Sequence, residues 1–427
     1  MLLRFIVDNY RSFGKEMSLD LIASNGLRDN IEGAFTDVGN FKILNSVAFY
    51  GANSSGKTNF LRAIGTMRRV IIQSVKLNEN DDLPYDPFLL TTEETRPTKF
   101  EAVIFNIVAK TTYTYGFEYT ISSISKEWLY VKSPRKSEKV LFSRDGDHIE
   151  INHVNFPEGN KVTVKLNRNR LYLSLVGQLG GSISNSIIAM FQNELHVLSG
   201  IENSDYSDYT RRLVHGNEKY KSLAHKFLQN MKLGFKEFET KKVEFEKIVF
   251  PQGFPAELIE QFRGRTIIEV SSLHSIYDKN GHVVGLTRLN LDENESSGTN
   301  KIFNLTGPIL EALQNGLILV IDELDSQMHP LISWRLIEIF NNRETNPNGA
   351  QLIFTTHDTL LLSNRLFRRD QIWLVEKDPV ECSTIYPLMQ ATDKLGHAPR
   401  SDSNYQKNYI QGVYGAIPDL INEILDE

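Results

Sequence analysis

The 427-residue sequence contains a single cysteine, Cys382, and no long hydrophobic run. One cysteine excludes an intramolecular disulfide framework. The longest uninterrupted apolar candidate, Leu317–Ile321, is far shorter than the roughly 20 residues that a membrane-spanning helix needs. The N-terminal residues also lack the basic and apolar regions of a signal peptide. We therefore expect a cytoplasmic protein with no membrane segment.

An excess of positive charge is also missing. The sequence has 47 Lys and Arg residues against 53 Asp and Glu residues, a net charge of −6, so composition provides no general attraction to nucleic acid. Local basic clusters at 132–139 and 161–170 leave direct nucleic-acid binding open. No internal repeat, low-complexity tract or sustained heptad pattern is present, which argues against long coiled-coil arms.

What is present is a pattern of alternating strands and helices. Residues 2–13 begin as a strand at or near a sheet edge, and the strand Ser46–Tyr50 runs through a glycine-rich loop into a helix over Thr58–Val70. Later elements repeat the alternation: they are a helix at Lys301–Asn315, a strand at Leu317–Ile321, a helix at Trp334–Phe340 and a strand at Gln351–Phe354. This order predicts an α/β fold with a mixed central sheet.

Two other patterns interrupt the alternation. Between residues 85 and 175, short alternating runs predict an antiparallel β subdomain, with strands at Phe100–Val108, Thr112–Ile121, Lys139–Ser143 and Val162–Leu166. Residues 180–262 predict a helical lobe, with helices at Ile187–Leu198 and Tyr220–Met231. A hairpin is expected at Ser272–Asn290, turning at Lys279–Gly281.

We therefore expect one head made of several parts. The parts are residues 1–77 with the first strand and the phosphate loop, the β subdomain at 85–175, the helical lobe at 180–262, a second half at 265–380 and a C-terminal extension at 381–427.

The strongest motif lies between the strand Ser46–Tyr50 and the following helix. Gly51–Thr58 fits G-x-x-x-x-G-K-[ST], in which glycines let backbone N–H groups surround phosphate oxygens at a helix N-terminus. Lys57 is expected to reach the β and γ phosphates of ATP, and the Thr58 hydroxyl to bind Mg²⁺. The candidate nucleotide-binding residues are Asn53, Ser54, Ser55, Gly56, Lys57, Thr58 and Asn59.

A second motif completes a nucleotide site. The apolar strand Leu317–Ile321 ends in Asp322 and Glu323, which places two carboxylates at the ligand edge of a parallel sheet. Asp322 is expected to support Mg²⁺, and Glu323 to orient or deprotonate the attacking water. A solvated strand end is the alternative reading of such acids, but the phosphate loop in the same chain favours the catalytic one.

Two further segments have both a structural and a functional reading. Ser296, Ser297 and Gly298 open a helix, where serine hydroxyls either cap the helix or bind an anion. His357 follows the strand Gln351–Phe354, and its structural reading is a surface histidine after a strand. Arg11, after the first strand, is equally well explained as a surface residue from the sequence alone.

Together these motifs resemble those of the ABC, SMC and RecF group of ATPases. Over nearly its full length the chain is similar to stand-alone RecF/SMC/OLD-like ATPases of bacterial anti-phage defence, including the ATPase subunits of PARIS-type and Rlo-type systems. The resemblance rests on residues 2–13, 51–58, 87–88 with 100, 295–299, 322–330, 356–357 and 409–418.

The resemblance assigns further roles. It implies an ABC-type head in which residues 324–326 form a D-loop and His357 senses the γ phosphate. It also implies that Ser296–Gly298 reaches the nucleotide of a second copy, and that Arg11 lies near the adenine or the phosphates. A head-to-head homodimer is then the minimum assembly, and a higher ring is compatible with the remaining surfaces.

The resemblance also implies a sensor and scaffold that controls a separate effector, such as a TOPRIM-type nuclease, in response to a phage-derived trigger. Only residues 358–427 follow the switch histidine, and they contain no Asp-x-Asp pair, so we expect no nuclease within this sequence. The alternative is a RecF-like repair or recombination ATPase that binds DNA directly.

Overall fold

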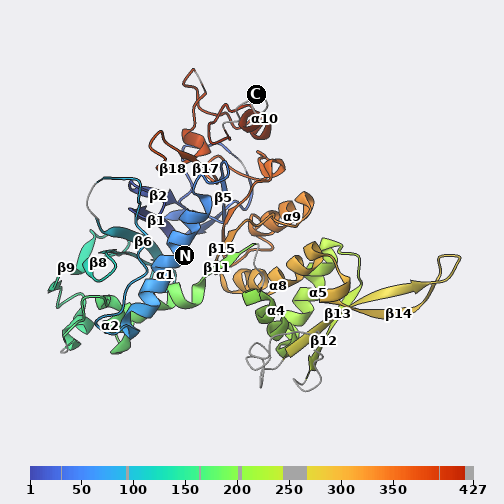
Figure 1. Cartoon of the computed structure of the whole chain (residues 1–427), viewed down its shortest axis with the longest axis horizontal. Coiled ribbons are helices and arrows are strands. Elements are labelled where there is room, and N and C mark those ends of the chain that lie inside the picture. Colours follow the sequence, from blue (N-terminus) through green and yellow to red (C-terminus); the bar gives the residue numbers. More distant parts are fainter. Residues whose placement is uncertain are drawn as a thin grey trace, which may run out of the picture.

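A six-stranded, mostly parallel sheet forms the centre of the structure (Figure 1). The computed structural model describes residues 1–29, 31–92, 96–162, 165–200, 204–243, 267–393 and 395–418. Neighbouring strands of the central sheet are parallel, except for the antiparallel pair at one edge. In spatial order the strands are β11 (Leu195–Ser199), β15 (Ile318–Asp322), β16 (Gln351–Thr355), β5 (Ser46–Tyr50), β17 (Ile372–Lys377) and β18 (Ser383–Pro387).

The middle strands of this sheet are buried on both faces. In β15, Ile318 and Val320 join the hydrophobic cluster on one face, whereas Leu319 and Ile321 join the cluster on the other face. Both faces therefore demand apolar side chains, which is why this strand reads as an uninterrupted hydrophobic run rather than an alternating one.

Helix α1 (Lys57–Gln73) lies between the central sheet and a second sheet of seven antiparallel strands. Its Phe60 ring packs 5.2 Å from Phe49 of β5 and 5.7 Å from Phe5 of the second sheet, measured between ring centroids. In spatial order the second sheet contains β10 (His148–Ile151), β9 (Lys139–Asp145), β8 (Ile124–Lys132), β7 (Thr111–Tyr119), β6 (Thr98–Asn106), β1 (Leu2–Asp8) and β2 (Met17–Asp20). The helix that follows the phosphate loop is thus held from two sides.

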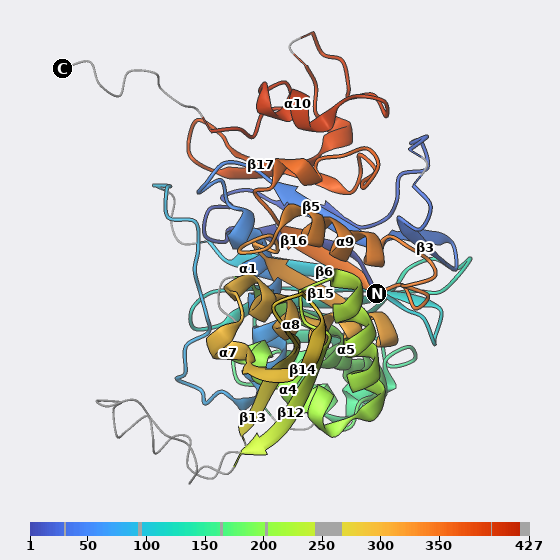
Figure 2. The same ribbon diagram turned by 90° about the vertical axis from the view of Figure 1, so that its right-hand side faces the viewer.

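A helical lobe covers the other face of the central sheet and carries a projecting hairpin (Figures 1 and 2). Its helices are α4 (Ser204–Gly216), α5 (Glu218–Met231), α7 (Leu291–Asn294) and α8 (Ser297–Asn315). The hairpin belongs to a three-stranded antiparallel sheet of β12 (Glu237–Val243), β13 (Ile267–Tyr277) and β14 (Val283–Asn290). We call the β13–β14 hairpin, which extends away from the body, the arm.

The remaining elements surround these layers. They are the strands β3 (Phe35–Val38) and β4 (Phe41–Leu44), and the helices α2 (Tyr172–Gln178), α3 (Ser182–Ala189), α9 (Pro330–Phe340) and α10 (Tyr405–Ile410). Short 3-10 turns lie at Ser74–Lys76, Pro157–Lys161, Thr359–Leu361 and Leu388–Gln390, and a π-helical turn lies at Met190–Glu194.

Helix α8 is joined to α4 at an internal proline. Pro308 has no N–H to donate to the carbonyl of Asn304, four residues earlier. The buried hydroxyl of Thr210, on α4, donates to that carbonyl instead, and it also accepts from the N–H of Gly307 at 3.2 Å. The Thr210 hydroxyl thus replaces the hydrogen bond that Pro308 cannot make and holds α8 against α4. The N-terminus of α8 carries the Ser296–Gly298 segment.

The predicted fold class is confirmed: the chain is α/β, with a mixed central sheet, an antiparallel β subdomain and a helical lobe. The strand at Ser46–Tyr50 has the predicted bounds, and the hairpin turns where the sequence places the turn. The helix predicted at Tyr220–Met231 is α5. The first strand is next to the edge of its sheet, as expected.

The helix predicted at Ile187–Leu198 is wrong at its C-terminal end, from Leu195 on. Helix α3 ends at Ala189, a π-helical turn follows, and residues 195–199 form β11. β11 pairs in parallel with β15 at the edge of the central sheet. Pairing with the open edge of β15 therefore outweighs the local helical pattern of these residues. The pattern of neighbouring residues cannot reveal this pairing, because the partner strand is distant in the sequence.

Other predictions are incomplete or fall on residues outside the description. Strand β8 was not anticipated, and the boundary at 380 divides the paired strands β17 and β18. Asp378 stabilises the turn between them, because its carboxylate accepts hydrogen bonds from the N–H groups of Val380 and Cys382.

Two predictions fall partly on residues that the structure does not describe. The strand predicted at 162–166 includes residues 163 and 164, which lie outside the described residues. The helical lobe predicted at 180–262 includes residues 201–203 and 244–262, which also lie outside them.

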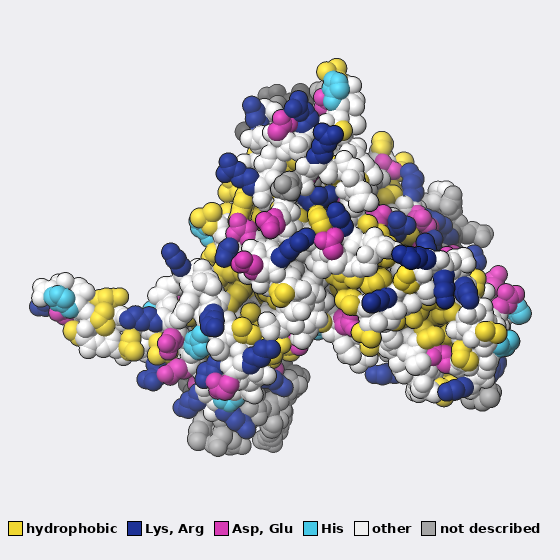
Figure 3. All heavy atoms as spheres, turned by 180° about the vertical axis from the view of Figure 1, so that it is seen from behind, with side chains coloured by type: hydrophobic (Ala, Val, Ile, Leu, Met, Phe, Trp, Pro, Cys, Tyr) yellow, Lys and Arg dark blue, Asp and Glu magenta, His cyan; other side chains and the backbone are white. Residues whose placement is uncertain are grey.

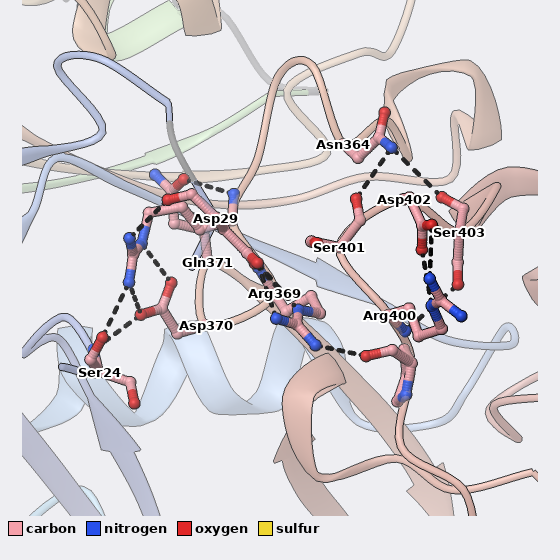
Figure 4. Close-up of polar contacts among 12 residues, drawn as sticks. Ser24, Asp29, Asn364, Arg369, Asp370, Gln371, Arg400, Ser401, Asp402 and Ser403 are labelled. Carbon is pink, nitrogen blue, oxygen red and sulfur yellow. Dashed lines mark hydrogen bonds and ion pairs between the residues drawn. The ribbon is translucent and has the colours of Figure 1, made fainter. Parts of the chain in front are cut away.

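Buried ion pairs join the N-terminal loop between β2 and β3 to the segment before β17 (Figure 4). The carboxylate of Asp29 accepts from the backbone N–H of Arg369 at 2.9 Å and from its guanidinium at 2.7 Å. Burial alone would raise the pKa of Asp29, but the hydrogen bonds from Arg369 outweigh it and hold that pKa below the ordinary value. The adjacent Arg368 pairs with Asp370, and both side chains are buried.

We predict that Asp29→Ala destabilises the fold, since removing one partner leaves the Arg369 cation desolvated and unpaired. The cost of breaking such a pair is about 3 kcal/mol, and the expected result is a fall of several degrees in the midpoint of thermal unfolding. Asp402→Ala is the matched control, because the Arg400–Asp402 pair is exposed (Figure 4) and such pairs contribute less than about 1 kcal/mol. Equal effects of the two substitutions would contradict the assignment.

Candidate functional site

The phosphate loop occupies the turn between β5 and α1, where its glycines lie against other segments. A side chain at Gly51 would collide with the carbonyl of Val375 on β17, and a side chain at Gly56 would collide with Ser12 and Ser383. Gly56 also has a φ of 116° and is the N-cap of α1. The glycines of the motif are therefore required by close packing and backbone conformation.

A cavity of about 590 Å³ opens in front of this loop. Nine of the predicted residues line it: Asn53, Ser54, Ser55, Gly56, Lys57, Thr58, Asn59, Glu323 and His357. Three lining residues were not predicted: Ser12, Arg62 and Lys377. Arg62 has a local signal in the sequence, because it lies within the predicted helix after the loop. Ser12 and Lys377 reach the cavity only through the pairing of distant strands.

The predicted metal corner is assembled at the carboxyl ends of three neighbouring strands. The hydroxyl of Thr58 donates to the Oδ1 atom of Asp322 at 3.1 Å, and the hydroxyl of Thr355 donates to the same oxygen at 2.7 Å. Within the described residues, no group of three or more His, Cys, Asp or Glu side chains is placed to hold a metal. A hydroxyl and a carboxylate are hard oxygen ligands of the kind that Mg²⁺ prefers, so Thr58 and Asp322 would fit that ion.

Lys57 is buried and turned onto its own loop. Its ammonium donates to the carbonyls of Gly51 and Ala52, at 2.8 and 2.9 Å. Burial lowers the pKa of Lys57 to about 8, although the carboxylates of Asp322 and Glu323 partly oppose the shift. The loop carbonyls thus hold the cation at the position from which it can turn toward a phosphate.

Glu323 stands on strained backbone at the rim of the cavity. Its φ of 53° lies in the left-handed region, which is unfavourable for a residue other than glycine and is concentrated at functional sites. Its N–H donates to the Thr355 hydroxyl at 2.7 Å, and its carbonyl accepts from the Lys301 ammonium at 3.2 Å. These contacts on both sides of the residue hold the carboxylate against the cavity.

His357 lies opposite, at the end of β16. Its backbone N–H donates to the carboxylate of Asp325 in the predicted D-loop at 3.3 Å. Burial and the nearby Lys57 cation lower its pKa, with weaker opposition from Asp325 and Glu323. The ring is therefore neutral at neutral pH and can donate one hydrogen bond to a phosphate oxygen.

Arg11 lies beside the phosphate cavity rather than in it. Its guanidinium pairs with Asp86 at 2.9 Å, and its N–H donates to the carbonyl of Asp86 at 2.8 Å. It lines an adjoining cavity of about 580 Å³ with Tyr85, Phe88, Leu89 and Leu90, and the two cavities share Ser12, Asn59 and Lys377. An apolar space continuous with a phosphate site suits a nucleobase.

Ser296, Ser297 and Gly298 do not line either cavity. Ser296 is the N-cap of α8 and accepts from the N–H of Thr299 at 3.1 Å, so the capping role is confirmed. Gly298 lies against Gln327, whose carbonyl oxygen would be 2.6 Å from an added Cβ. One chain therefore contains the phosphate loop, the acidic pair and His357 together, but leaves the Ser296–Gly298 segment apart.

We predict that affinity for ATP falls as pH rises above about 8. Below that pH Lys57 is protonated without nucleotide, whereas above it binding must also take up a proton, at a cost of up to about tenfold in affinity per pH unit. Titration with a fluorescent ATP analogue between pH 6.5 and 9.5 measures this. Lys57→Ala should bind weakly and without the decline, and a flat profile for the unsubstituted protein would contradict the assignment.

The sequence and the structure were also compared with known proteins. The family described as "AAA domain, putative AbiEii toxin, Type IV TA system" matches residues 46–363. No curated protein matches the chain. Within the described residues, no helix is long and apolar enough to cross a membrane.

Solved structures with low sequence identity are similar to the chain. The SMC head domain from Thermotoga maritima is 14% identical, with a TM-score of 0.41, over 90% of this chain and 98% of that one. A structure of the recombination mediator protein RecF, titled RecF-ATPrS, is 13% identical, with a TM-score of 0.30, over 87% and 97% of the two chains. Another, titled RecF-ATP, is 13% identical, with a TM-score of 0.28, over 84% and 92%.

Proposed function

The chain belongs to this AbiEii-like AAA domain family, and from that premise we propose that it binds ATP with Mg²⁺ and hydrolyses it. One observation carries the proposal: the hydroxyl of Thr58 meets Asp322 at 3.1 Å, beside a cavity that Lys57, Glu323 and His357 also line. Phosphoryl transfer to water requires a cation, metal ligands and a base. The edge of the parallel sheet brings together Lys57 as the cation, Thr58 and Asp322 as metal ligands and Glu323 as the base.

The roles follow from where each group lies. The N–H groups of the loop and the Lys57 ammonium bind the phosphates, while Thr58 and Asp322 hold Mg²⁺, which neutralises the developing charge. Glu323 orients the attacking water and accepts its proton. His357, neutral because burial lowers its pKa, donates to the γ phosphate. Arg11 and Phe88 border the space for the base.

We further propose that the protein works as a homo-oligomer with ATP between two copies. The Ser296–Gly298 segment does not line its own cavity, yet it lies against the loop that follows Glu323. A second copy that places this segment over the phosphates would complete the site, and ATP would then hold the two heads together. A dimer is the minimum that satisfies this arrangement.

The biological role that fits such an assembly is that of a cytoplasmic sensor and scaffold in anti-phage defence, as in PARIS-type or Rlo-type systems. In this role ATP-dependent assembly controls a separate effector, which we expect to be a TOPRIM-type nuclease, after a phage-derived trigger. The AbiEii name of the family is compatible with this role. A Lys57→Ala chain that still protected cells from phage would remove it.

The second candidate is a RecF-like ATPase that binds DNA directly, and one observation favours it. Several exposed lysines on α5, β12 and the turn between them have no ion-pair partner among the described residues: Lys219, Lys226, Lys232, Lys236, Lys241 and Lys242. Basic side chains of this kind attract phosphate backbones in a salt-dependent way. The surface is local, since the whole chain carries a net charge of −6.

Glu323→Gln tests the ATPase assignment. Removing the base should lower phosphate release about a hundredfold or more, while the nucleotide affinity changes little and the ATP-bound dimer persists. Phosphate release and light scattering with and without ATP measure these quantities. Glu344→Gln, at an exposed position outside the cavity, is the matched control and should behave as the unsubstituted protein.

Undiminished turnover in the Glu323→Gln protein would contradict the role of Glu323. The same preparation distinguishes the two biological candidates when duplex DNA is added. Binding that depends on ATP and weakens steeply with salt supports the RecF-like function, whereas no binding at low salt leaves the scaffold function.

A further inference from the structure

Glu295, directly before the Ser296–Gly298 segment, is held by two side chains of the arm. Its Oε1 atom accepts from the hydroxyl of Ser272 at 2.6 Å and lies 2.7 Å from Nε2 of His274. Both partners belong to β13. Ser272 is fully buried, and the Glu295 side chain is 11% exposed, so the contact is shielded from competing water.

The three side chains are not arranged as a catalytic triad. In a Ser-His-acid relay the carboxylate binds one ring nitrogen and the serine binds the other. Here a single nitrogen, Nε2 of His274, faces both the Ser272 hydroxyl at 3.1 Å and the carboxylate. The cluster therefore holds Glu295 in place rather than activating the serine.

From Glu295 the contacts continue to the acidic end of β15. Gly298, the second residue of α8, lies against the carbonyl of Gln327. Lys301, on the same helix, donates to the carbonyls of Glu323 and Ser326, at 3.2 and 2.6 Å. Burial lowers the pKa of Lys301 to about 8. The start of α8 thus joins the arm on one side to the backbone of the predicted base on the other.

The arm extends away from this cluster and is closed by a turn at its tip. At its tip, Asp278 accepts the N–H groups of Asn280 and His282, both at 2.8 Å, which closes the turn. Beside its base, Phe238 of β12, the strand that pairs with β13, packs edge-on against Phe303 of α8, with the ring centroids 5.3 Å apart. Figure 3 shows the arm projecting from the body with hydrophobic side chains along it. The arm and the start of α8 are therefore joined by the side-chain contacts of Glu295 at the base of the hairpin.

We propose that Glu295, held by Ser272 and His274, is a positioning residue that sets the Ser296–Gly298 segment for the nucleotide of a second copy. The proposal rests on the proposed function, because it concerns the same composite site. The acceptor oxygen of Glu295 ties the residue before the N-cap of α8 to two side chains on β13. Losing that oxygen frees the segment without touching the phosphate loop, so assembly and turnover suffer while nucleotide binding by one chain does not.

The test compares Glu295→Ala with Glu295→Gln, whose amide oxygen still accepts both hydrogen bonds. We expect Glu295→Ala to weaken ATP-dependent dimerisation at least about tenfold and to lower kcat by a similar factor. The affinity of the monomer for a fluorescent ATP analogue should stay within about twofold. Glu295→Gln should restore dimerisation and kcat to within about threefold of the unsubstituted protein. Glu293→Ala, an exposed glutamate two residues earlier, is the matched control and should change none of these values.

A Ser272→Ala/His274→Ala protein provides a second route, since it removes both donors and leaves Glu295. It should reproduce the Glu295→Ala result and serves as the test if that variant does not fold. The proposal is overturned if dimerisation and kcat stay unchanged in these variants. It is also overturned if the affinity of the monomer for nucleotide falls together with dimerisation and kcat. Either result would leave the composite site itself standing. If the unsubstituted protein itself does not dimerise with ATP, the proposed composite site fails, and this inference fails with it.

Discussion

The hydrogen bond between the Thr58 hydroxyl and Asp322 joins two segments that are 264 residues apart in the sequence. It forms because β15, β16 and β5 are neighbours in a parallel sheet, so that their carboxyl ends meet at one edge. Thr355, from the middle strand, donates to the same Asp322 oxygen. Every other group of the site is placed relative to this corner: Glu323 follows Asp322, and Lys57 precedes Thr58. The buried central strands provide the rigidity that the corner needs.

Part of the strained backbone lies in the loops near this corner, while other residues with positive φ, such as Lys110 and Arg135, lie elsewhere. Asn9, Arg11, Ser54, Glu323 and Gln327 all have φ values between 50° and 62°, in the left-handed region that residues other than glycine seldom adopt. Such conformations persist only where surrounding contacts over-determine them. The contacts are visible at Asn9, whose amide donates to the carbonyl of Arg96, and at Arg11, whose backbone is bonded to Asp86. Contacts with the folded body of the protein thus hold these loops in their strained conformations around the nucleotide cavity.

The parts of the site that the sequence predicted are those with local signals. Two motifs can be recognised from fewer than ten consecutive residues each. One is the glycine-rich loop between a strand and a helix, and the other is the apolar run that ends in two acids. Lys377 and Ser12 could not be identified in this way, because each reaches the cavity only through the pairing of a distant strand. The same reason explains β11: its residues form a strand because β15 offers an open edge. Glu295 was noted only as the start of a motif, since its partners lie more than twenty residues away.

The division of the site between two chains is the central claim, and mixing two inactive proteins tests it most directly. Lys57→Ala removes the phosphate-binding cation, and Gly298→Asp blocks the segment that we assign to the second copy. Alone, each protein should hydrolyse no ATP. Mixed in equal amounts, random pairing gives heterodimers with one intact site, and about a quarter of the unsubstituted activity should return. Recovery of that activity supports the account, and a mixture as inactive as its components, despite forming heterodimers, would contradict it.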